Sequence, residues 1–162
     1  MASAMQPPFH DDVRRFRRHL LAVAVVVAAS IFLLQTAWAG DPRISADEAH
    51  RRAAAGDVLL IDVRTPREWR QTGLPVDAAT ATLRAPHGND GFLQRIEQLT
   101  GGRRDQPVAL ICATGVRSAH AARLLRQQGY TAVIDVNEGM HGNRNGDGWL
   151  KRDLPVRACN AC

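Results

Sequence analysis

The chain has 162 residues, 45% hydrophobic and 23% charged, so it suits one globular domain and is too apolar to be disordered. Its formal charge is +5, but four basic and two acidic residues precede position 39, which leaves 17 basic and 14 acidic residues scattered over the rest. With one Tyr and four Phe available to stack on bases, this distribution argues against a nucleic-acid-binding surface.

The first 39 residues have the organisation of a secretory signal peptide. A basic stretch at 14–19 precedes fifteen apolar or small residues at 20–34, and residues 37–39 (AWA) form an A-x-A cleavage signal. The run from 20 to 39 holds twenty mostly apolar residues, which is enough for an uncleaved membrane anchor. Because the basic flank stays in the cytoplasm in either case, we expect an exported, periplasmic protein, bound to the membrane only if the segment is uncleaved.

From residue 40 onward, helical patterns alternate with short apolar runs. Capping boxes at 45–48 and 65–68 predict two helices, one ending near Gly56 and a short one that runs through Trp69. Three apolar runs predict strands buried on both faces of a parallel sheet, and two amphipathic stretches predict further helices. The runs cover 58–61, 108–111 and 132–136, and the stretches cover 92–99 and 118–127.

The remaining segments are less regular. Residues 73–91 have no clear pattern, and the glycine-rich stretch at 139–148 predicts a loop that borders the site described next. The alternation of strands and helices predicts one α/β domain over 40–157, followed by a C-terminal tail at 158–162.

Cys112 directly follows the predicted strand at 108–111, and ligands bind at the carboxyl ends of strands in open α/β sheets. The next five residues can turn their backbone N–H groups toward the sulfur, and Gly115 permits the positive φ that such a turn needs. These amides, the following helix dipole and the Arg117 guanidinium favour an anion, and the thiolate is the nucleophilic form of a thiol. The alternative is an inert cysteine in the core.

The sequence resembles the rhodanese homology domain over nearly all of residues 44–156. Residues 60–69 (LIDVRTPREW) resemble that family's first signature, and residues 111–119 (ICATGVRSA) resemble its sulfur-binding loop. Three later features resemble its last strand, glycine turn and closing aromatic residue, at 129–136, 138–140 and Trp149. The resemblance implies a three-layer α/β domain with a mainly parallel five-stranded sheet flanked by helices.

The resemblance also implies roles at matching positions. Cys112 would be the nucleophile that forms a persulfide, and Arg117 would brace the loop. Asp62 would be a supporting carboxylate that holds loop groups and Arg64 a structural partner, although both also fit a plain ion pair. The backbone amides that would bind the anionic sulfur belong to Ala113, Thr114, Gly115, Val116 and Arg117.

The activity implied is sulfur transfer from a donor such as thiosulfate, through a Cys112 persulfide, to cyanide or to a small or protein thiol. The Cys-x4-Arg spacing fits this activity, because the phosphatase and arsenate-reductase relatives have a wider Cys-x5-Arg loop. The sequence departs from the family at 73–78 (GLPVDA), where the common Gly-His-Ile-Pro-Gly-Ala stretch has a histidine. A non-catalytic persulfide carrier or binding module stays open as an alternative.

The terminal Cys159-Asn160-Ala161-Cys162 motif offers a further alternative, a thiol–disulfide protein that acts through Cys159 and Cys162. It predicts either an oxidised pair in a flexible tail or a redox pair that takes sulfur from Cys112. No helix follows to activate a thiol, and no second cysteine pair completes a zinc site. Because the six histidines also lack metal-ligand spacing, we expect neither a metal nor another cofactor.

Overall fold

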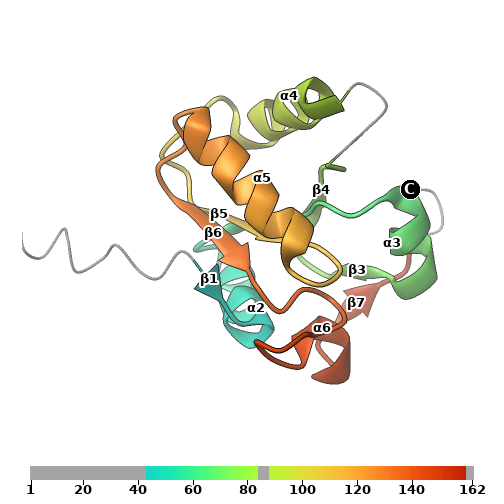
Figure 1. Ribbon diagram of the computed structural model, residues 1–162. Helices are drawn as coiled ribbons and strands as arrows, with labels where there is room; N and C mark the ends of the chain where they lie inside the picture. The colour runs from blue at the N-terminus through green and yellow to red at the C-terminus, as the bar shows by residue number, and fades with distance from the viewer. Residues whose placement is uncertain (1–42, 84–87, 160–162) are drawn as a thin grey trace, which may run out of the picture. The chain divides into compact units, whose positions relative to one another are not determined.

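The computed structural model describes residues 43–83 and 88–159 (Figure 1). Within these ranges, no helix is both long and apolar enough to span a membrane. The predicted leader at 1–39 lies outside the described residues, so its export role stays a prediction.

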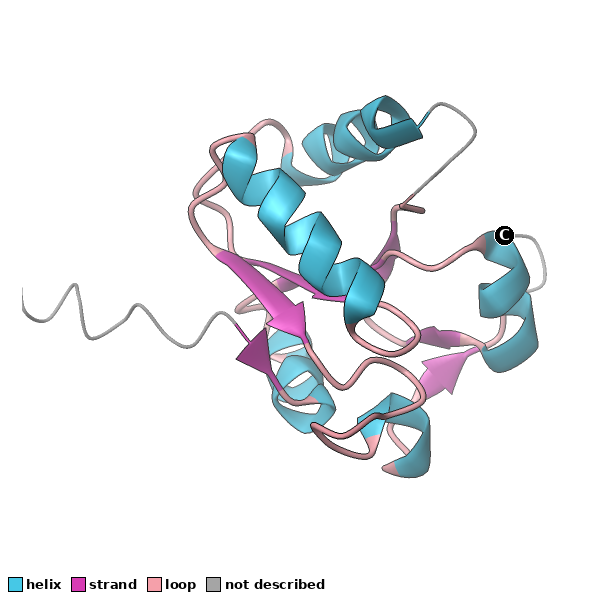
Figure 2. Cartoon of the chain, in the orientation of Figure 1, coloured by secondary structure: helices cyan, strands magenta, loops and turns pink. Residues whose placement is uncertain are grey.

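A five-stranded sheet, in which all neighbouring strands are parallel, forms the centre of the domain (Figure 2). Its strands, in spatial order, are β1 (Arg43–Ile44), β6 (Val133–Val136), β5 (Val108–Ile111), β2 (Leu59–Asp62) and β4 (Ala79–Thr80). The predicted α/β fold with a mainly parallel five-stranded sheet is therefore confirmed. The two edge strands escaped prediction because two residues are too few to show a hydrophobic pattern.

Helices cover both faces of this sheet, which gives the predicted three layers (Figure 1). One face carries α4 (Gly88–Thr100) and α5 (Val116–Gln127), and the other carries α2 (Ala46–Ala54) and α6 (Gly148–Lys151). Beside the sheet lies α3 (Pro66–Thr72), and the short strand β3 (Leu74–Pro75) directly follows it. β3 forms an antiparallel pair with β7 (Val156–Arg157) of the C-terminal segment.

Two hydrophobic clusters fill the spaces between the layers. Along β5, Leu110 packs into the cluster that contains Phe92 of α4 and Leu125 of α5. Its neighbours Ala109 and Ile111 pack into the cluster on the α2 and α6 side. Successive side chains of a strand point to opposite faces, so a strand covered on both sides is apolar throughout. This explains why 108–111 is one continuous apolar run.

The helix starts follow the local sequence signals. In α3, Thr65 and Glu68 form the complete predicted capping box, with Pro66 in the first helical turn. In α2, the Ser45 hydroxyl accepts a hydrogen bond from the Glu48 N–H, but the Glu48 carboxylate binds arginines one turn along the helix. The helix predicted from 118 begins at Val116, because Gly115 with φ +84° serves as its N-cap.

Candidate active site

The Cys112 thiol lies at the carboxyl end of β5, beneath the first turn of α5. Ile111 is opposite Asp62 in the β5–β2 register, so both strands end at one edge of the sheet. The Gly115 N–H donates to Cys112 Sγ at 3.2 Å, and Ser118 Oγ lies 3.4 Å from the same sulfur. Cys112 has a free thiol and is 1% exposed. The predicted nucleophile therefore has hydrogen-bond donors on one side and little direct access to solvent.

Gly115 is required by two features of its backbone. Its φ of +84° is unfavourable for residues with a Cβ, and a Cβ there would lie 2.3 Å from the Asn137 carbonyl oxygen. The loop from Cys112 to Arg117 is therefore packed directly against the segment that follows β6.

The glycine-rich segment after β6 fixes the Cys112 loop by donating hydrogen bonds to the carbonyl groups of that loop. The Met140 N–H donates to the Cys112 carbonyl at 2.8 Å, and the His141 N–H donates to the Ala113 carbonyl at 2.9 Å. The Asn143 side-chain amide donates to the Thr114 carbonyl at 2.8 Å. Because these carbonyls accept hydrogen bonds from outside the loop, the loop stays in the curved conformation that turns the Gly115 N–H toward the sulfur.

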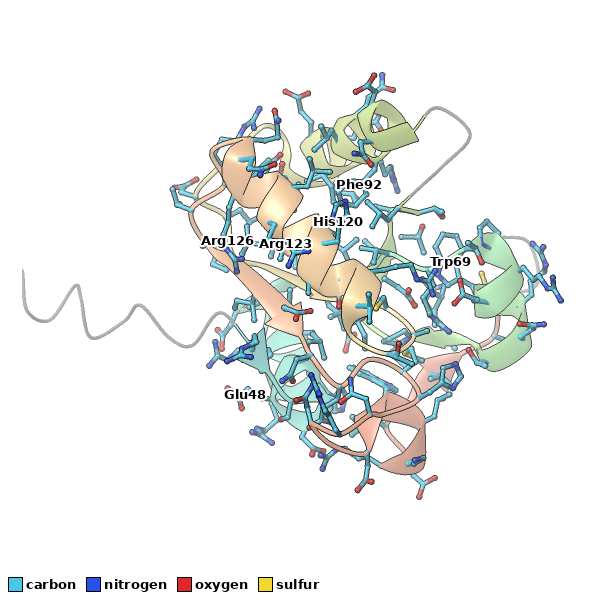
Figure 3. All side chains as sticks on the ribbon, viewed as in Figure 1. Glu48, Trp69, Phe92, His120, Arg123 and Arg126 are labelled. Carbon is cyan, nitrogen blue, oxygen red and sulfur yellow. The ribbon has the colours of Figure 1, made fainter. Side chains whose placement is uncertain are left out.

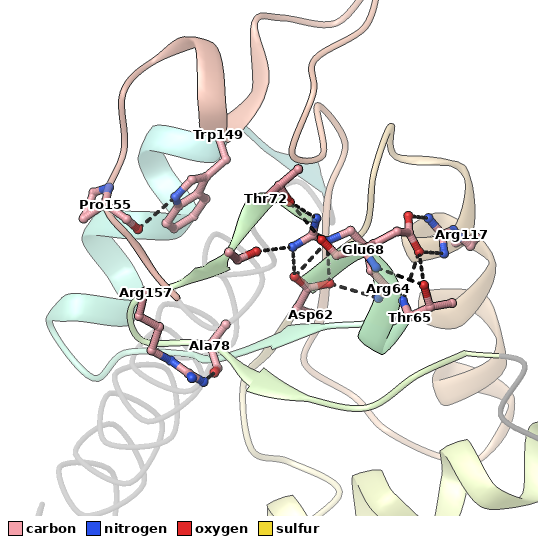
Figure 4. Close-up of polar contacts among 11 residues, drawn as sticks. Asp62, Arg64, Thr65, Glu68, Thr72, Ala78, Arg117, Trp149, Pro155 and Arg157 are labelled. Carbon is pink, nitrogen blue, oxygen red and sulfur yellow. Dashed lines mark hydrogen bonds and ion pairs between the residues drawn. The ribbon is translucent and has the colours of Figure 1, made fainter. Parts of the chain in front are cut away.

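Arg117 joins α5 to α3 by pairing with Glu68 (Figure 4). Its Nη1 donates to Glu68 Oε2 at 2.8 Å and its Nη2 donates to Oε1, which forms a bidentate pair. This pairing, aided by the Thr65 N–H, lowers the pKa of Glu68 to about 2. The same contact raises the pKa of Arg117, and the charges of Cys112 and Asp62 act in the same direction. Arg117 thus anchors the base of the loop to the neighbouring helix.

Asp62 and Arg64 form a fully buried ion pair, with both side chains 0% exposed. Arg64 Nη2 lies 2.7 Å from Asp62 Oδ2, and Arg64 also donates to Thr72 Oγ1 and the Gly73 carbonyl, each at 2.7 Å (Figure 4). Among the described residues, the Asp62 carboxylate accepts its hydrogen bonds from Arg64. Of the two roles that the sequence left open for Asp62, the contacts are those of the ion pair and not of a carboxylate that holds loop groups, and Arg64 also fixes the C-terminal end of α3.

The C-terminal segment is packed on the domain as far as Cys159, in contrast to the flexible tail that we expected from 158. β7 pairs with β3, and Cys159 is 6% exposed in a small cluster with Trp69 and Leu74. Cys159 is disulfide-bonded. Cys162, the partner that the sequence predicts, lies outside the described residues.

Three residues at the site were missed by the sequence reasoning. Glu68 was assigned only to a helix cap, whereas its carboxylate caps α3 and pairs with Arg117 at once. The sequence predicts Ser118 only as the start of a helix, whereas its side chain is 0% exposed beside the thiol. Asn143 lies in a loop whose sequence indicated no contact partner. In the part of the chain that the structure describes, no three His, Cys, Asp or Glu side chains are grouped to hold a metal ion.

The sequence matches the rhodanese-like domain family over residues 45–145, which include β2, α3, the Cys112 loop and α5. A sulfurtransferase of Allochromatium vinosum is 31% identical over 110 residues, which cover 68% of this chain and 88% of that protein. An uncharacterised protein of Rickettsia prowazekii is 29% identical over 101 residues, which cover 61% and 82% of the two chains.

Solved structures agree with these sequence matches. The polysulfide-sulfur transferase homodimer of Wolinella succinogenes has a TM-score of 0.55 and 26% identity, covering 83% of this chain and 90% of that one. A protein of M. tuberculosis has a TM-score of 0.56 and 28% identity, and the match covers 72% of this chain and 97% of that one. These relatives support a role in sulfur transfer or in carrying a persulfide, and the chain belongs to the rhodanese-like domain family.

Proposed function

We propose that this protein is a sulfurtransferase in which Cys112 accepts sulfane sulfur as a persulfide and passes it to a thiophilic acceptor. The observation that carries the proposal is the Gly115 N–H, which points at Cys112 Sγ from 3.2 Å at the start of α5. Such a donor stabilises a thiolate, and the amino end of a helix favours the same negative charge.

The reaction proceeds in two displacements. In the first, the Cys112 thiolate attacks the outer sulfur of a donor such as thiosulfate; the new S–S bond forms as the donor's own S–S bond breaks, and sulfite leaves with the electron pair. In the second, an acceptor attacks the terminal sulfur of the persulfide, and the Sγ–S bond breaks with its electrons returning to Cys112. Neither displacement consumes a proton, so the site must stabilise anionic sulfur.

The residues around the loop bear on the choice of donor and acceptor. Thr114 and Val116 are exposed at the loop, and Val116 is 74% exposed. The cationic group of the loop, Arg117, is already paired with Glu68. We therefore propose a general sulfane-sulfur donor and a thiol or cyanide acceptor, including a protein thiol.

The test is sulfur transfer by the purified chain, assayed with thiosulfate and with a polysulfide, and with cyanide as acceptor. Intact mass after donor treatment reports a gain of one sulfur. Cys112→Ser should lose both turnover and the adduct, and the double variant Cys159→Ser/Cys162→Ser is the control that removes the other two cysteines. Loss of turnover and adduct in both variants, or retention of either one in Cys112→Ser, would contradict the proposal.

One observation favours the second candidate, a non-catalytic persulfide carrier. Cys112 is only 1% exposed, so acceptors would have little access to a persulfide once it has formed there, and the sulfur would be retained. A carrier would gain one sulfur on Cys112 in the mass measurement but show no turnover with any acceptor. Turnover with any donor–acceptor pair excludes it.

We also propose that the protein is exported, from the basic stretch, apolar core and A-x-A signal within residues 1–39. The mass of the protein recovered from the periplasm of an expression host tests this. A mature chain that begins at Gly40 is expected. An uncleaved chain in the membrane fraction would indicate the anchor, and an uncleaved chain in the cytoplasm would contradict export.

A further inference from the structure

Asp135 is a buried carboxyl group close to the Cys112 loop that the proposed reaction does not use. It is 5% exposed, and its Oδ1 has no hydrogen-bond partner among the described residues. Asp135 is opposite Leu110 in the sheet, and Leu110 packs on the α4 and α5 side. Paired residues on neighbouring strands point to the same face, so the carboxyl group lies beneath α5. It also lines a cavity of about 630 Å³ together with Thr114 and Gly115.

The Ser118 hydroxyl lies beside the thiol and acts on the Asp135 carboxyl group as well. Its Oγ lies 3.4 Å from Cys112 Sγ and 3.1 Å from the Gly115 carbonyl oxygen. Burial raises the pKa of Asp135, and the nearby Ser118 hydroxyl opposes that rise. A hydroxyl has one hydrogen to donate, so the Cys112 sulfur, the Gly115 carbonyl oxygen and the Asp135 carboxylate compete for it.

We propose that Asp135 is a positioning residue that sets, through the Ser118 hydroxyl, how strongly the Cys112 thiolate is stabilised. When Asp135 is ionised, Ser118 donates to the carboxylate. When Asp135 is protonated, its O–H donates to Ser118 Oγ, and the Ser118 hydrogen turns to the thiolate, because a bond to an anion is stronger than one to a neutral carbonyl. The inference rests on the proposed function, in which this thiolate attacks the donor and later leaves the persulfide.

Other charged groups around Asp135 keep their charge while it titrates. Arg43 is opposite Asp135 on β1, and Arg123 and Arg126 extend from α5 (Figure 3). Arg144 lines the same cavity. The charge of Cys112 raises the pKa of Arg117, which is the fifth cation near the site. All five are guanidinium groups that stay protonated at working pH. The switch therefore depends on one carboxyl group and one thiol.

This arrangement lets Asp135 control both halves of the reaction. A better stabilised thiolate is present in larger fraction at neutral pH, and it leaves a disulfide or persulfide faster. Asp135→Asn imitates the protonated acid, because its amide can donate to Ser118 and carries no charge.

The experiment measures iodoacetamide alkylation of Cys112 against pH in a Cys159→Ser/Cys162→Ser background, so that one thiol reacts. Asp135→Asn should lower the midpoint of the alkylation profile by about one pH unit, the effect of one hydrogen bond to a charged group. In a Ser118→Ala background the same change should shift the midpoint by less than half as much. Asp57→Asn is the control: it removes an exposed carboxylate just before the start of β2, and it should leave the midpoint of the alkylation profile unchanged.

An equal shift with and without Ser118, or no shift in folded Asp135→Asn protein, would overturn the inference. If Asp135→Asn does not fold, as judged by circular dichroism, Asp135→Leu should give the same Ser118-dependent shift. The alkylation profile does not require sulfur transfer. A protein with the predicted profile but no transfer would therefore contradict the proposed function and leave the role of Asp135 intact.

Discussion

Arg117 and Glu68 connect the helix that follows the Cys112 loop to the helix that follows β2 (Figure 4). Each side chain is about one-quarter exposed, at 27% and 25%, so the pair is partly shielded from water. Glu68 also completes the capping box of α3, because its carboxylate accepts a hydrogen bond from the N–H of the N-cap residue Thr65. One carboxylate therefore fixes the start of α3 and the base of the Cys112 loop.

Replacing Glu68 with Gln should lower the free energy of unfolding at pH 7 by about 1 to 2 kcal/mol. The full difference between the ordinary pKa of 4.5 and the folded-state pKa of about 2 would give a larger loss, but solvent screens a partly exposed pair. The folded-state pKa of about 2 lies below the ordinary 4.5, so this stability is present above pH 4.5 and is lost as the pH falls toward 2. Urea unfolding of both proteins at pH 7, 4 and 3 should show the difference between them shrinking. A difference independent of pH would mean that the charge of Glu68 does not stabilise the fold.

Gly115 and Gly129 flank the same helix and provide a matched pair of substitutions. Both have φ of +84°, but a Cβ at Gly129 meets nothing within 4 Å, whereas one at Gly115 meets the Asn137 carbonyl at 2.3 Å. Gly129→Ala should cost about 1 to 2 kcal/mol, the conformational cost alone. Gly115→Ala should cost more and reduce sulfur transfer at least tenfold, because the loop must move. Denaturant unfolding and turnover of the two variants test this, and equal effects would show that the contact with Asn137 is unimportant.

The sequence predicted the local parts of this site better than the contacts between them. Gly115 follows a cysteine at the end of an apolar strand, so both its positive φ and its place near the sulfur could be inferred. The partner of Arg117 could not, because Glu68 is 49 residues away and already had an assignment as a helix cap. Asp135 interrupts an apolar strand, and only its register with β5 places it beneath α5. Contacts set by register and by helix packing leave no local trace in the sequence.

The Asp62–Arg64 pair should matter for stability far more than an exposed pair. Asp62→Asn leaves the Arg64 guanidinium buried without its countercharge, and we expect a loss of about 3 to 5 kcal/mol. The control is Glu48→Gln, which breaks exposed contacts with Arg51 and Arg52 and should cost no more than about 1 kcal/mol. Urea denaturation of the two variants gives the comparison. Comparable losses would show that Arg64 finds compensation from Thr72 and Gly73 alone.

Cys159 distinguishes a structural role of the C-terminal cysteines from a role in sulfur relay. Its burial against Trp69 and Leu74 predicts that Cys159→Ser lowers stability by about 1 to 3 kcal/mol, because the change breaks the disulfide and puts a hydroxyl without a partner in an apolar cluster. Trp69 fluorescence should change with it, since this ring is 6% exposed in the wild-type protein. The persulfide on Cys112 should form and discharge at the wild-type rate, because Cys159 packs with α3 and β3 and not with the Cys112 loop. If both proteins are compared after a reductant has opened the disulfide, a variant that retains the persulfide several-fold longer would show instead that the Cys159 thiol accepts the sulfur.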